Sequence, residues 1–221
     1  MRFDIITIFP KIFDSYLNES ILKRAQIKKL LSIKAHNVRD FAKDKHKSVD
    51  DKPYGGGAGM VMMADPILRA FNSVSKKKKS KTIILSAKGK QFNQKIALKL
   101  AKIDHIILIS GRYEGIDERV KIALRAEEIS IGPYVLTDGD VAVQVLISAI
   151  ARLIPGVIKL ESLKEESYRN LLLKGKIEKN GLEYPHYTRP ETLNYKNRKY
   201  LVPKVLLSGH HKKIEEWRRK H

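Results

Sequence analysis

Two glycine-bearing loops, each preceded by a short apolar run, are the residues of this chain best placed to form a ligand site. The first run, 106–110, leads into the sequence GRYEG at 111–115, and the second, 129–131, leads into a loop at 132–140. Short β-branched runs bounded by glycine are typical of buried strands. In open α/β sheets, ligands bind beyond the carboxyl ends of such strands. The two loops therefore predict one shared pocket.

These loops lie in a chain where apolar runs alternate with helical patterns. Strands are predicted at 3–9, 31–37, 82–85, 105–110 and 127–131, and helices at 13–28, 60–75, 91–102, 116–124 and 141–154. This alternation predicts an α/β fold with a mostly parallel sheet and flanking helices. The last helix is apolar on all sides, so another helix, a sheet or a second subunit must cover it.

The composition changes after this helix. Residues 157–180 are polar, with an excess of Lys and Glu, and from residue 182 the chain turns aromatic, basic and rich in proline. We therefore expect a domain at 1–160 that holds the pocket, a flexible linker at 161–180 and a small helical domain at 181–221.

The chain is strongly basic, with 44 Lys and Arg, 24 Asp and Glu, and a net charge of +20. Residues 169–221 hold 14 Lys and Arg against 5 Asp and Glu, so the last quarter is the most densely basic. Such a surplus favours a polyanionic partner, with nucleic acid as the first candidate and an anionic membrane as the second. A solvated lysine-rich surface is the alternative. The clustering favours a localised nucleic-acid handle.

Several classes of protein are excluded by what the sequence lacks. It has no cysteine, which excludes disulfides, thiol nucleophiles and thiolate metal sites, and no metal ligand is predicted. No signal peptide is indicated. The longest apolar stretch, 141–151, is interrupted by Gln144 and Ser148 and falls short of the roughly 20 residues that a membrane span needs. We expect a cytoplasmic protein without a membrane partner.

A third glycine-bearing segment, PYGGGAGM at 53–60, has four glycines in five residues. Glycine lets a backbone approach a ligand closely and adopt positive φ. A flexible loop is the alternative, but flexible linkers are mixtures of Gly and Ser, whereas aromatic, charged and Met residues frame this run. No Gly-Lys-Ser/Thr follows, so it is not a Walker A loop and gives no support to nucleoside triphosphate hydrolysis.

Short motifs follow one another along nearly the whole chain. They are FDIIT at 3–7, RDF at 39–41, DKH at 44–46, PYGGGAGM at 53–60, GRYEGIDER at 111–119, SIG at 130–132, YVL at 134–136, IPGV at 154–157, PHYTRP at 185–190 and LLSGH at 206–210. In this order they resemble the TrmD family of bacterial tRNA (guanine-N1)-methyltransferases. The resemblance implies a SPOUT-class fold with a deep trefoil knot, and a homodimer with composite active sites. It also implies methyl transfer from S-adenosyl-L-methionine to N1 of the guanosine at anticodon-loop position 37 of tRNA.

By this resemblance, the two pocket loops wrap the adenosyl group. Backbone hydrogen bonds and apolar walls would come from the glycine that opens the first loop and from 131–136. Glu114 would approach the methionine part, and a structural ion pair with Arg112 or Arg119 is its alternative. The full set of predicted cofactor residues is Gly111, Tyr113, Glu114, Ile131, Gly132, Pro133, Tyr134, Val135, Leu136 and Gly139.

The implied reaction needs a base and a cation. N1 of guanine carries a proton at neutral pH, so methylation requires its removal, and a cation lowers the barrier by stabilising the charge that develops toward O6. The resemblance places the cation at Arg152 and the base at Glu166, where the family usually has Asp-Ser-Phe and this chain has Glu-Ser-Tyr at 166–168. Glu165 is the alternative base. For Arg152 the alternative is a structural partner of the helix C-terminal dipole.

RNA contacts are assigned to two segments. Asp50, Gly57, Gly59 and Met60 would lie near the flipped guanosine and its 5′ neighbour. His186, Tyr187 and Arg189 suit stacking and phosphate contacts, the means by which RNA loops are recognised. Packing within the small domain is the alternative for His186 and Tyr187.

The second pocket loop departs from the family pattern, which usually reads Gly-Asp-Tyr-Val-Leu-Thr-Gly-Gly-Glu. Pro133, Asp138 and Asp140 stand where that pattern has Asp, Gly and Glu. A glycine position can require positive φ, which Asp tolerates better than most residues. Two alternative functions stay open. One is a SPOUT enzyme with another RNA target, because the pocket is shared more widely than the substrate. The other, motivated by Asp138 and Glu166, is an RNA-binding protein whose pocket has decayed.

Overall fold

The computed structural model describes residues 1–75, 79–159 and 184–220, so the predicted linker at 161–180 lies outside the described residues. The chain separates into two compact units, Met1–Leu160 and Glu161–His221. Each unit is described by itself.

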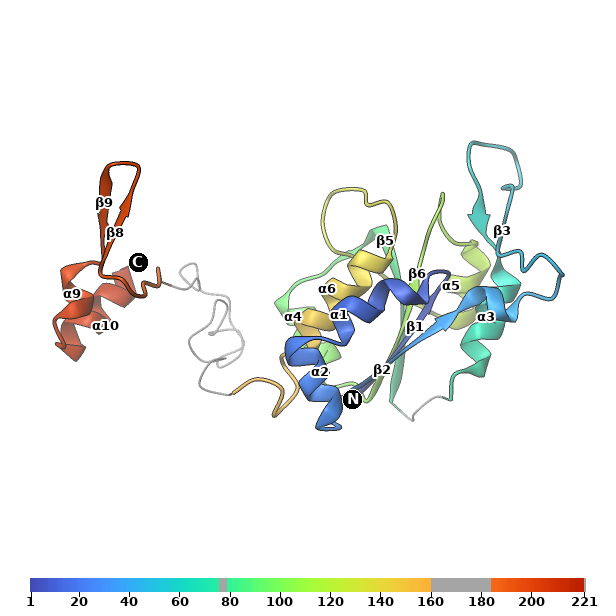
Figure 1. Ribbon diagram of the computed structural model, residues 1–221. Helices are drawn as coiled ribbons and strands as arrows, with labels where there is room; N and C mark the ends of the chain where they lie inside the picture. The colour runs from blue at the N-terminus through green and yellow to red at the C-terminus, as the bar shows by residue number, and fades with distance from the viewer. Residues whose placement is uncertain (76–78, 160–183, 221) are drawn as a thin grey trace. The chain divides into compact units, whose positions relative to one another are not determined.

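The N-terminal unit is built on a five-stranded sheet with the order β2-β1-β6-β5-β7 (Figure 1). Its strands are β1 (Arg2–Thr7), β2 (Ser32–Asn37), β5 (Ser80–Gln91), β6 (His105–Ser110) and β7 (Glu127–Ser130). All four neighbouring pairs are parallel, which confirms the predicted parallel sheet. Every residue of the central strand β6 is buried.

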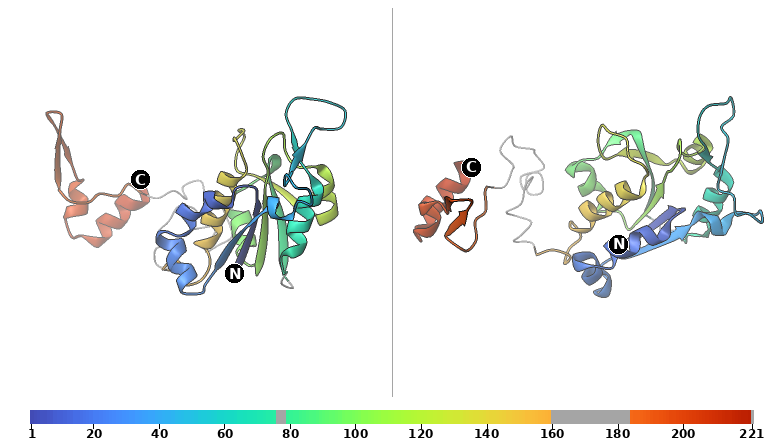
Figure 2. Two further views of the ribbon diagram at one scale, coloured as in Figure 1. Left: turned by 45° about the vertical axis from the view of Figure 1, so that its right-hand side comes forward. Right: turned by 45° about the horizontal axis from the view of Figure 1, so that its top comes forward.

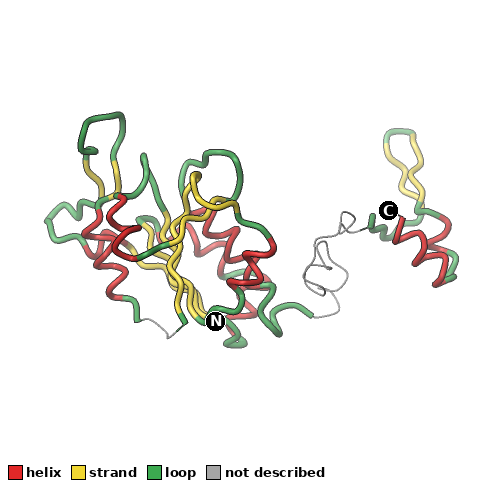
Figure 3. The backbone as a smooth tube through the Cα atoms, turned by 180° about the vertical axis from the view of Figure 1, so that it is seen from behind, coloured by secondary structure: helices red, strands yellow, loops and turns green. Residues whose placement is uncertain are grey.

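Helices cover both faces of this sheet (Figures 2 and 3). They are α1 (Asp14–Leu17), α2 (Ser20–Ile27), α3 (Ala64–Ser73), α4 (Gln94–Leu100), α5 (Glu118–Leu124) and α6 (Asp140–Ala151), with short 3-10 turns at η1 (Pro10–Phe13) and η2 (Val38–Phe41). Successive residues of a strand point to opposite faces. In β6, Ile106 and Leu108 accordingly join the core under α6, whereas Ile107 and Ile109 join the core under α3.

Two predicted helices are shorter than expected. The pattern at 13–28 forms η1, α1 and α2, with a break at 18–19. Leu17 and Leu22 are both buried, and a five-residue spacing would place them on different sides of a continuous helix, so the break lets both reach the core. The pattern at 60–75 becomes helical only at Ala64, because Val61–Met62 forms a strand, β4, that pairs with β3 (Asp50–Asp51).

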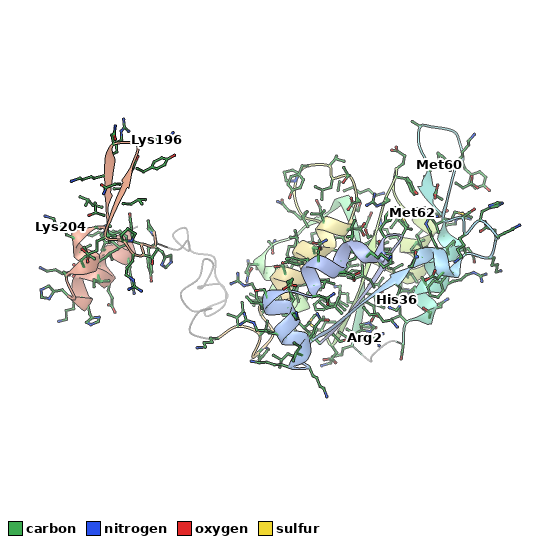
Figure 4. All side chains as sticks on the ribbon, in the orientation of Figure 1. Arg2, His36, Met60, Met62, Lys196 and Lys204 are labelled. Carbon is green, nitrogen blue, oxygen red and sulfur yellow. The ribbon has the colours of Figure 1, made fainter. Side chains whose placement is uncertain are left out.

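A buried charged cluster joins β1, β2 and β6 in the N-terminal half of the sheet. Its centre is Asp4, whose two carboxylate oxygens lie 2.6 Å from His36 Nε2 and 2.7 Å from His105 Nε2. Arg2 Nη2 also donates to Asp4, at 2.9 Å, and Figure 4 labels Arg2 and His36. Burial by itself would raise the pKa of Asp4, but the hydrogen bonds from His36, Arg2 and His105 outweigh it and lower that pKa from 3.8 to about 2.

We expect Asp4→Asn to cost about 2 kcal/mol of unfolding free energy at pH 7. A depressed carboxyl pKa contributes stability above pH 3.8, and this contribution is lost as the pH falls from 3.8 toward 2. The variant should therefore lose the part of the pH dependence that wild type shows in this window, as measured by urea unfolding. Asp65→Asn, which breaks an exposed helical pair with Arg69, serves as control and should cost less than about 1 kcal/mol. An unchanged pH slope in Asp4→Asn would refute this account.

The C-terminal unit contains a hairpin as well as helices. Strands β8 (Thr192–Tyr195) and β9 (Arg198–Leu201) pair antiparallel, and the helices are α9 (Lys204–Leu207) and α10 (His211–Lys220). The turn residues Lys196 and Asn197 have φ values of 47° and 57°, as in the two-residue turns whose twist matches a hairpin. Among the described residues of the whole chain, no helix has the length and apolar character to cross a membrane.

Candidate active site

A cavity of about 410 Å³ lies at the carboxyl ends of β6 and β7, beside the middle of β5. Its walls come mainly from three segments, of which the first lies within β5, the second follows β6 and the third runs from β7 into the loop beyond it. The segments are 84–88, 111–118 and 128–139, of which Pro133 is the one residue that does not line the cavity. The structure thus brings the two glycine-bearing loops together around one pocket, and adds the middle of β5 as a third wall.

The predicted cofactor residues all line this cavity except Pro133, which is exposed in the same loop. Three further residues that were not predicted also line it, namely Ser86, Lys88 and Asp117. The first two directly follow the predicted strand at 82–85, so the position beyond a strand end was the signal that could have found them. Hydrogen bonds from Arg119 lower the pKa of Asp117, so this carboxylate at the pocket is ionised and paired.

The two loops meet at a point where only glycine fits. Gly139 donates its N–H to the carbonyl of Gly111 at 2.8 Å. A Cβ at Gly139 would lie 2.9 Å from the nitrogen of Gly111 and 3.0 Å from Ser110 Oγ, closer than carbon atoms normally approach. The first loop bends sharply here, because Tyr113 has φ of 58°, in the left-handed region.

The acidic residues near the pocket have different partners from those considered in the sequence analysis. Arg112 pairs with Asp138 at 3.2 Å and Asp140 at 3.4 Å, and Arg119 pairs with Asp117 at 2.6 Å. Neither arginine pairs with Glu114, so the alternative of a structural ion pair for that residue is not formed. Asp138 does not adopt positive φ. Its side chain instead caps the N-terminus of α6 by accepting the N–H of Asp140 at 2.9 Å.

The glycine-rich segment lies beside the first pocket loop. Gly57, Gly59 and Met60 belong to the connection between β3 and β4, and Figure 4 labels Met60 and Met62 there. Gly57 and Gly59 have φ of 127° and 77°, as the glycine content predicted. Glu114 donates its N–H to Met60 O at 3.0 Å, and a Cβ at Gly59 would collide with the Glu114 side chain.

Asp50, the remaining residue of the first predicted RNA-binding group, starts β3 and pairs with Met62 of β4. Met62 in turn donates its N–H to Gly115 O at 2.9 Å. The structure therefore brings this RNA-binding group next to the predicted cofactor residues.

Of the predicted catalytic residues, Arg152 does not line this cavity. Arg152 follows the last residue of α6, whose first residue lies at the pocket. Twelve helical residues rise by about 18 Å, which is longer than an arginine side chain. Arg152 lines a separate cavity of about 380 Å³, together with Tyr16, Ile21 and Ser148. Glu166 and its alternative Glu165 lie outside the described residues.

The second predicted RNA-binding group lies in the C-terminal unit. His186, Tyr187 and Arg189 are exposed. Tyr187 is 6.3 Å from the ring of Trp217, and His186 is 4.7 Å from the ring of Tyr184. The rings of His186 and Tyr187 therefore pack within the unit and still present a face to solvent.

No group of three or more His, Cys, Asp or Glu in the described ranges is placed to hold a metal ion.

Comparison with known proteins bears directly on this site. The family model for tRNA (guanine-1)-methyltransferase, TrmD, matches residues 1–221. A tRNA (guanine-N(1)-)-methyltransferase of Carboxydothermus hydrogenoformans is 52% identical over 221 residues, covering all of this chain and 82% of that protein. The protein of the same name in Thermomicrobium roseum is 54% identical over 99% of this chain and 78% of its own length. A third, in Clostridioides difficile, is 48% identical over 99% of this chain and 91% of its own length.

The family inferred from short motifs is thus confirmed over the full length of the chain. The segments that meet at the pocket, including GRYEG at 111–115 and the glycine-rich run at 53–60, are the ones that carried the resemblance. The chain belongs to the TrmD family of tRNA (guanine-N1)-methyltransferases.

Proposed function

We propose that this chain transfers a methyl group from S-adenosylmethionine to N1 of guanosine at position 37 of tRNA. It acts as a homodimer with a trefoil-knotted SPOUT fold. The observation that carries the proposal is the meeting of the two pocket loops with the glycine-rich segment, because the residues predicted to hold the cofactor then lie directly beside those predicted to hold the target base.

The residues at the pocket fit S-adenosylmethionine, which when bound supplies an electrophilic methyl group on a sulfonium. Leu136 and Val135 provide apolar wall, and the absence of a side chain at Gly139 lets the two loops approach closely enough to form one pocket. Glu114 lies at the same wall and forms no ion pair among the described residues, so its carboxylate is suited to the positive charge of a sulfonium or ammonium group. Ser110 Oγ is buried without a hydrogen-bond partner among the described residues, so it can accept or donate to a ligand or a bridging water.

On the guanine side, Glu166 removes the N1 proton and Arg152 stabilises the charge that develops on O6. One chain does not carry Arg152 to its own pocket, because the length of α6 separates them. Two α6 helices packed antiparallel about a two-fold axis would set each Arg152 beside the pocket of the other subunit. This geometry supports composite active sites.

The surface around α6 supports such a dimer. Phe9, Ile12 and Tyr16 of the η1–α1 region are 43%, 40% and 40% exposed, and Val141 and Val145 of α6 are 49% and 41% exposed. Figure 1 shows α1 lying along α6. A row of large apolar side chains on one face is more often an interface than free surface.

The C-terminal unit supplies a surface that binds RNA. In the hairpin, Leu193 faces Tyr200 and Tyr195 faces Arg198. Residues two apart share a face of a strand, so these four side chains form one aromatic and basic surface. All four are exposed. Aromatic rings next to arginine are suited to stack unpaired bases, and His186, Tyr187 and Arg189 extend this surface chemistry within the unit.

Replacing Tyr195 or Tyr200 by alanine should weaken tRNA binding roughly tenfold, since stacking on an aromatic side chain contributes about 1–3 kcal/mol per base. Asn194→Ala, on the opposite face of the same hairpin, is the matched control and should bind as wild type does. Fluorescence anisotropy at fixed salt measures these affinities. If the control and the tyrosine variants lose affinity equally, the hairpin face does not stack bases.

A transfer assay tests the function as a whole. Radiolabelled methyl is followed from S-adenosylmethionine to tRNA transcripts that differ only in having guanosine or adenosine at position 37. Label should appear on the guanosine transcript alone, because adenosine lacks both the N1–H that Glu166 would contact and the O6 that Arg152 would contact. Equal labelling of both transcripts, or failure of the chain to bind S-adenosylmethionine in calorimetry, would refute the proposal.

A further inference from the structure

The second pocket loop, 132–140, is anchored mainly near its two ends. At its start Ser130 Oγ donates to Gly132 O at 2.9 Å, and at its end Gly139 donates to Gly111 O at 2.8 Å. Between these anchors the side chains are open to solvent, with Val135 86% exposed and Tyr134 53% exposed. This middle part forms a wall of the pocket. The hydrogen bonds at the ends of the loop therefore determine the position of that wall.

Asp138 ties the end of this loop to two neighbouring elements. Its Oδ1 accepts the N–H groups of Asp140 at 2.9 Å and Val141 at 3.4 Å, at the start of α6. Its Oδ2 accepts from Arg112 Nη2 at 3.2 Å and from the Thr137 hydroxyl at 3.0 Å. One carboxylate thus connects the second loop, α6 and the first loop.

The carboxylate of Asp140 also lies near Arg112, but it cannot connect the second loop to the first loop as Asp138 does. Asp140 belongs to α6 and is fully buried, and its Oδ1 accepts from Thr7 Oγ1 at 2.8 Å. Its Oδ2 lies 3.4 Å from Arg112 Nη2, longer than the contact made by Asp138. The guanidinium of Arg112 is also stacked over the ring of Phe9, 4.4 Å from its centroid. The contacts with Phe9 and Asp140 therefore hold the Arg112 side chain in place. Asp138 is the residue that connects the second loop to it.

We propose that Asp138 is a positioning residue that, through Arg112, holds the second loop in the form that receives S-adenosylmethionine and so sets how long the cofactor stays bound. This inference rests on the proposed function. Both oxygens of Asp138 are occupied by protein donors, so it acts through the loop and does not serve as a ligand. Without the link, the loop would have to be ordered again at each binding event, which lowers affinity.

Three variants separate this role from a structural one. Asp138→Ser keeps a side chain that can cap α6 but removes the carboxylate that Arg112 contacts. Asp138→Ala removes both the cap and the link, and Arg112→Gln removes the guanidinium. Asp138→Ser should unfold thermally as wild type does, yet bind S-adenosylmethionine about tenfold more weakly, because a hydrogen bond to a charged group is lost. Asp138→Ala should show the same loss of affinity together with a lower unfolding temperature.

Calorimetry gives the cofactor affinities, and stopped-flow displacement gives the dissociation rates. The expected loss in Asp138→Ser appears as faster dissociation, and its affinity for tRNA alone stays at the wild-type value. In a double-mutant cycle, Asp138→Ser combined with Arg112→Gln should bind no more weakly than Arg112→Gln alone, since either change breaks the same link.

Wild-type cofactor affinity and dissociation rate in Asp138→Ser would overturn the inference, as would losses that simply add in the double variant. A wild-type chain that fails to bind S-adenosylmethionine would overturn the proposed function and the inference together. The two failures are therefore distinguishable.

Discussion

Replacing Glu166 by glutamine is expected to lower methyl transfer by about 10²–10⁴-fold while leaving cofactor affinity unchanged. The guanine N1 keeps its proton at neutral pH, so attack on the methyl group requires a base in the transition state. Glutamine has nearly the same shape as glutamate but cannot accept that proton. The wall residues that would hold the cofactor are in the 111–118 and 128–139 segments, so this change should not disturb them.

Single-turnover methyl transfer measures the loss, and calorimetry with S-adenosylmethionine checks that binding survives. Glu165→Gln is the matched control, because it removes the neighbouring carboxylate of the same pair. Wild type should show a rate that rises with pH and levels off once the base is ionised, and Glu166→Gln should lose this rise. A large loss in Glu165→Gln with normal turnover in Glu166→Gln would assign the base to Glu165 instead.

Mixing two inactive variants is expected to restore activity. Arg152→Ala should lower transfer by about 10²–10³-fold, the usual effect of removing a group that stabilises transition-state charge. Gly139→Val should block the pocket, because even a Cβ there would crowd Gly111 and Ser110. In a mixed dimer, the intact pocket of one subunit would be completed by the intact Arg152 of the other.

Random exchange of subunits should give about half mixed dimers with one complete site each, hence about a quarter of wild-type activity. The measurement is the transfer rate of the two variants apart and after co-refolding, with both chains tagged for purification of mixed dimers. Activity that stays at the level of the separate variants would show that Arg152 serves the pocket of its own chain, or none.

The arrangement of the sheet illustrates what a single sequence can and cannot predict. Alternating strand and helix patterns predicted parallel strands correctly, because the 2.0 and 3.6 periods are local properties. The strand order was not predictable in the same way, since β1 pairs with β6 across about a hundred residues of chain. The charged cluster around Asp4 was missed for this reason: it exists only once β1, β2 and β6 are neighbours.

The walls of the pocket were largely predictable from the sequence, but the role of Asp138 was missed. Strand ends followed by glycine located two of its three walls. Asp138 was considered only as the occupant of a glycine position that can require positive φ, yet it caps α6. The signal was present, because an aspartate just before a long apolar helix is a typical N-cap. The distance between the pocket and Arg152 could have been anticipated as well, since the two lie at opposite ends of one predicted helix.

The strand order also has a consequence for how the chain is made. Asp4 and His105 are separated by 101 residues, which at bacterial rates of synthesis corresponds to roughly 5–20 seconds. Throughout that interval β1, with its apolar Phe3, Ile5 and Ile6, lacks the central strand against which it packs. The nascent N-terminal unit must therefore emerge from the ribosome almost completely before its sheet can close. During this time the apolar side chains of its first strand are exposed to other chains, which makes this strand a candidate for binding by a chaperone.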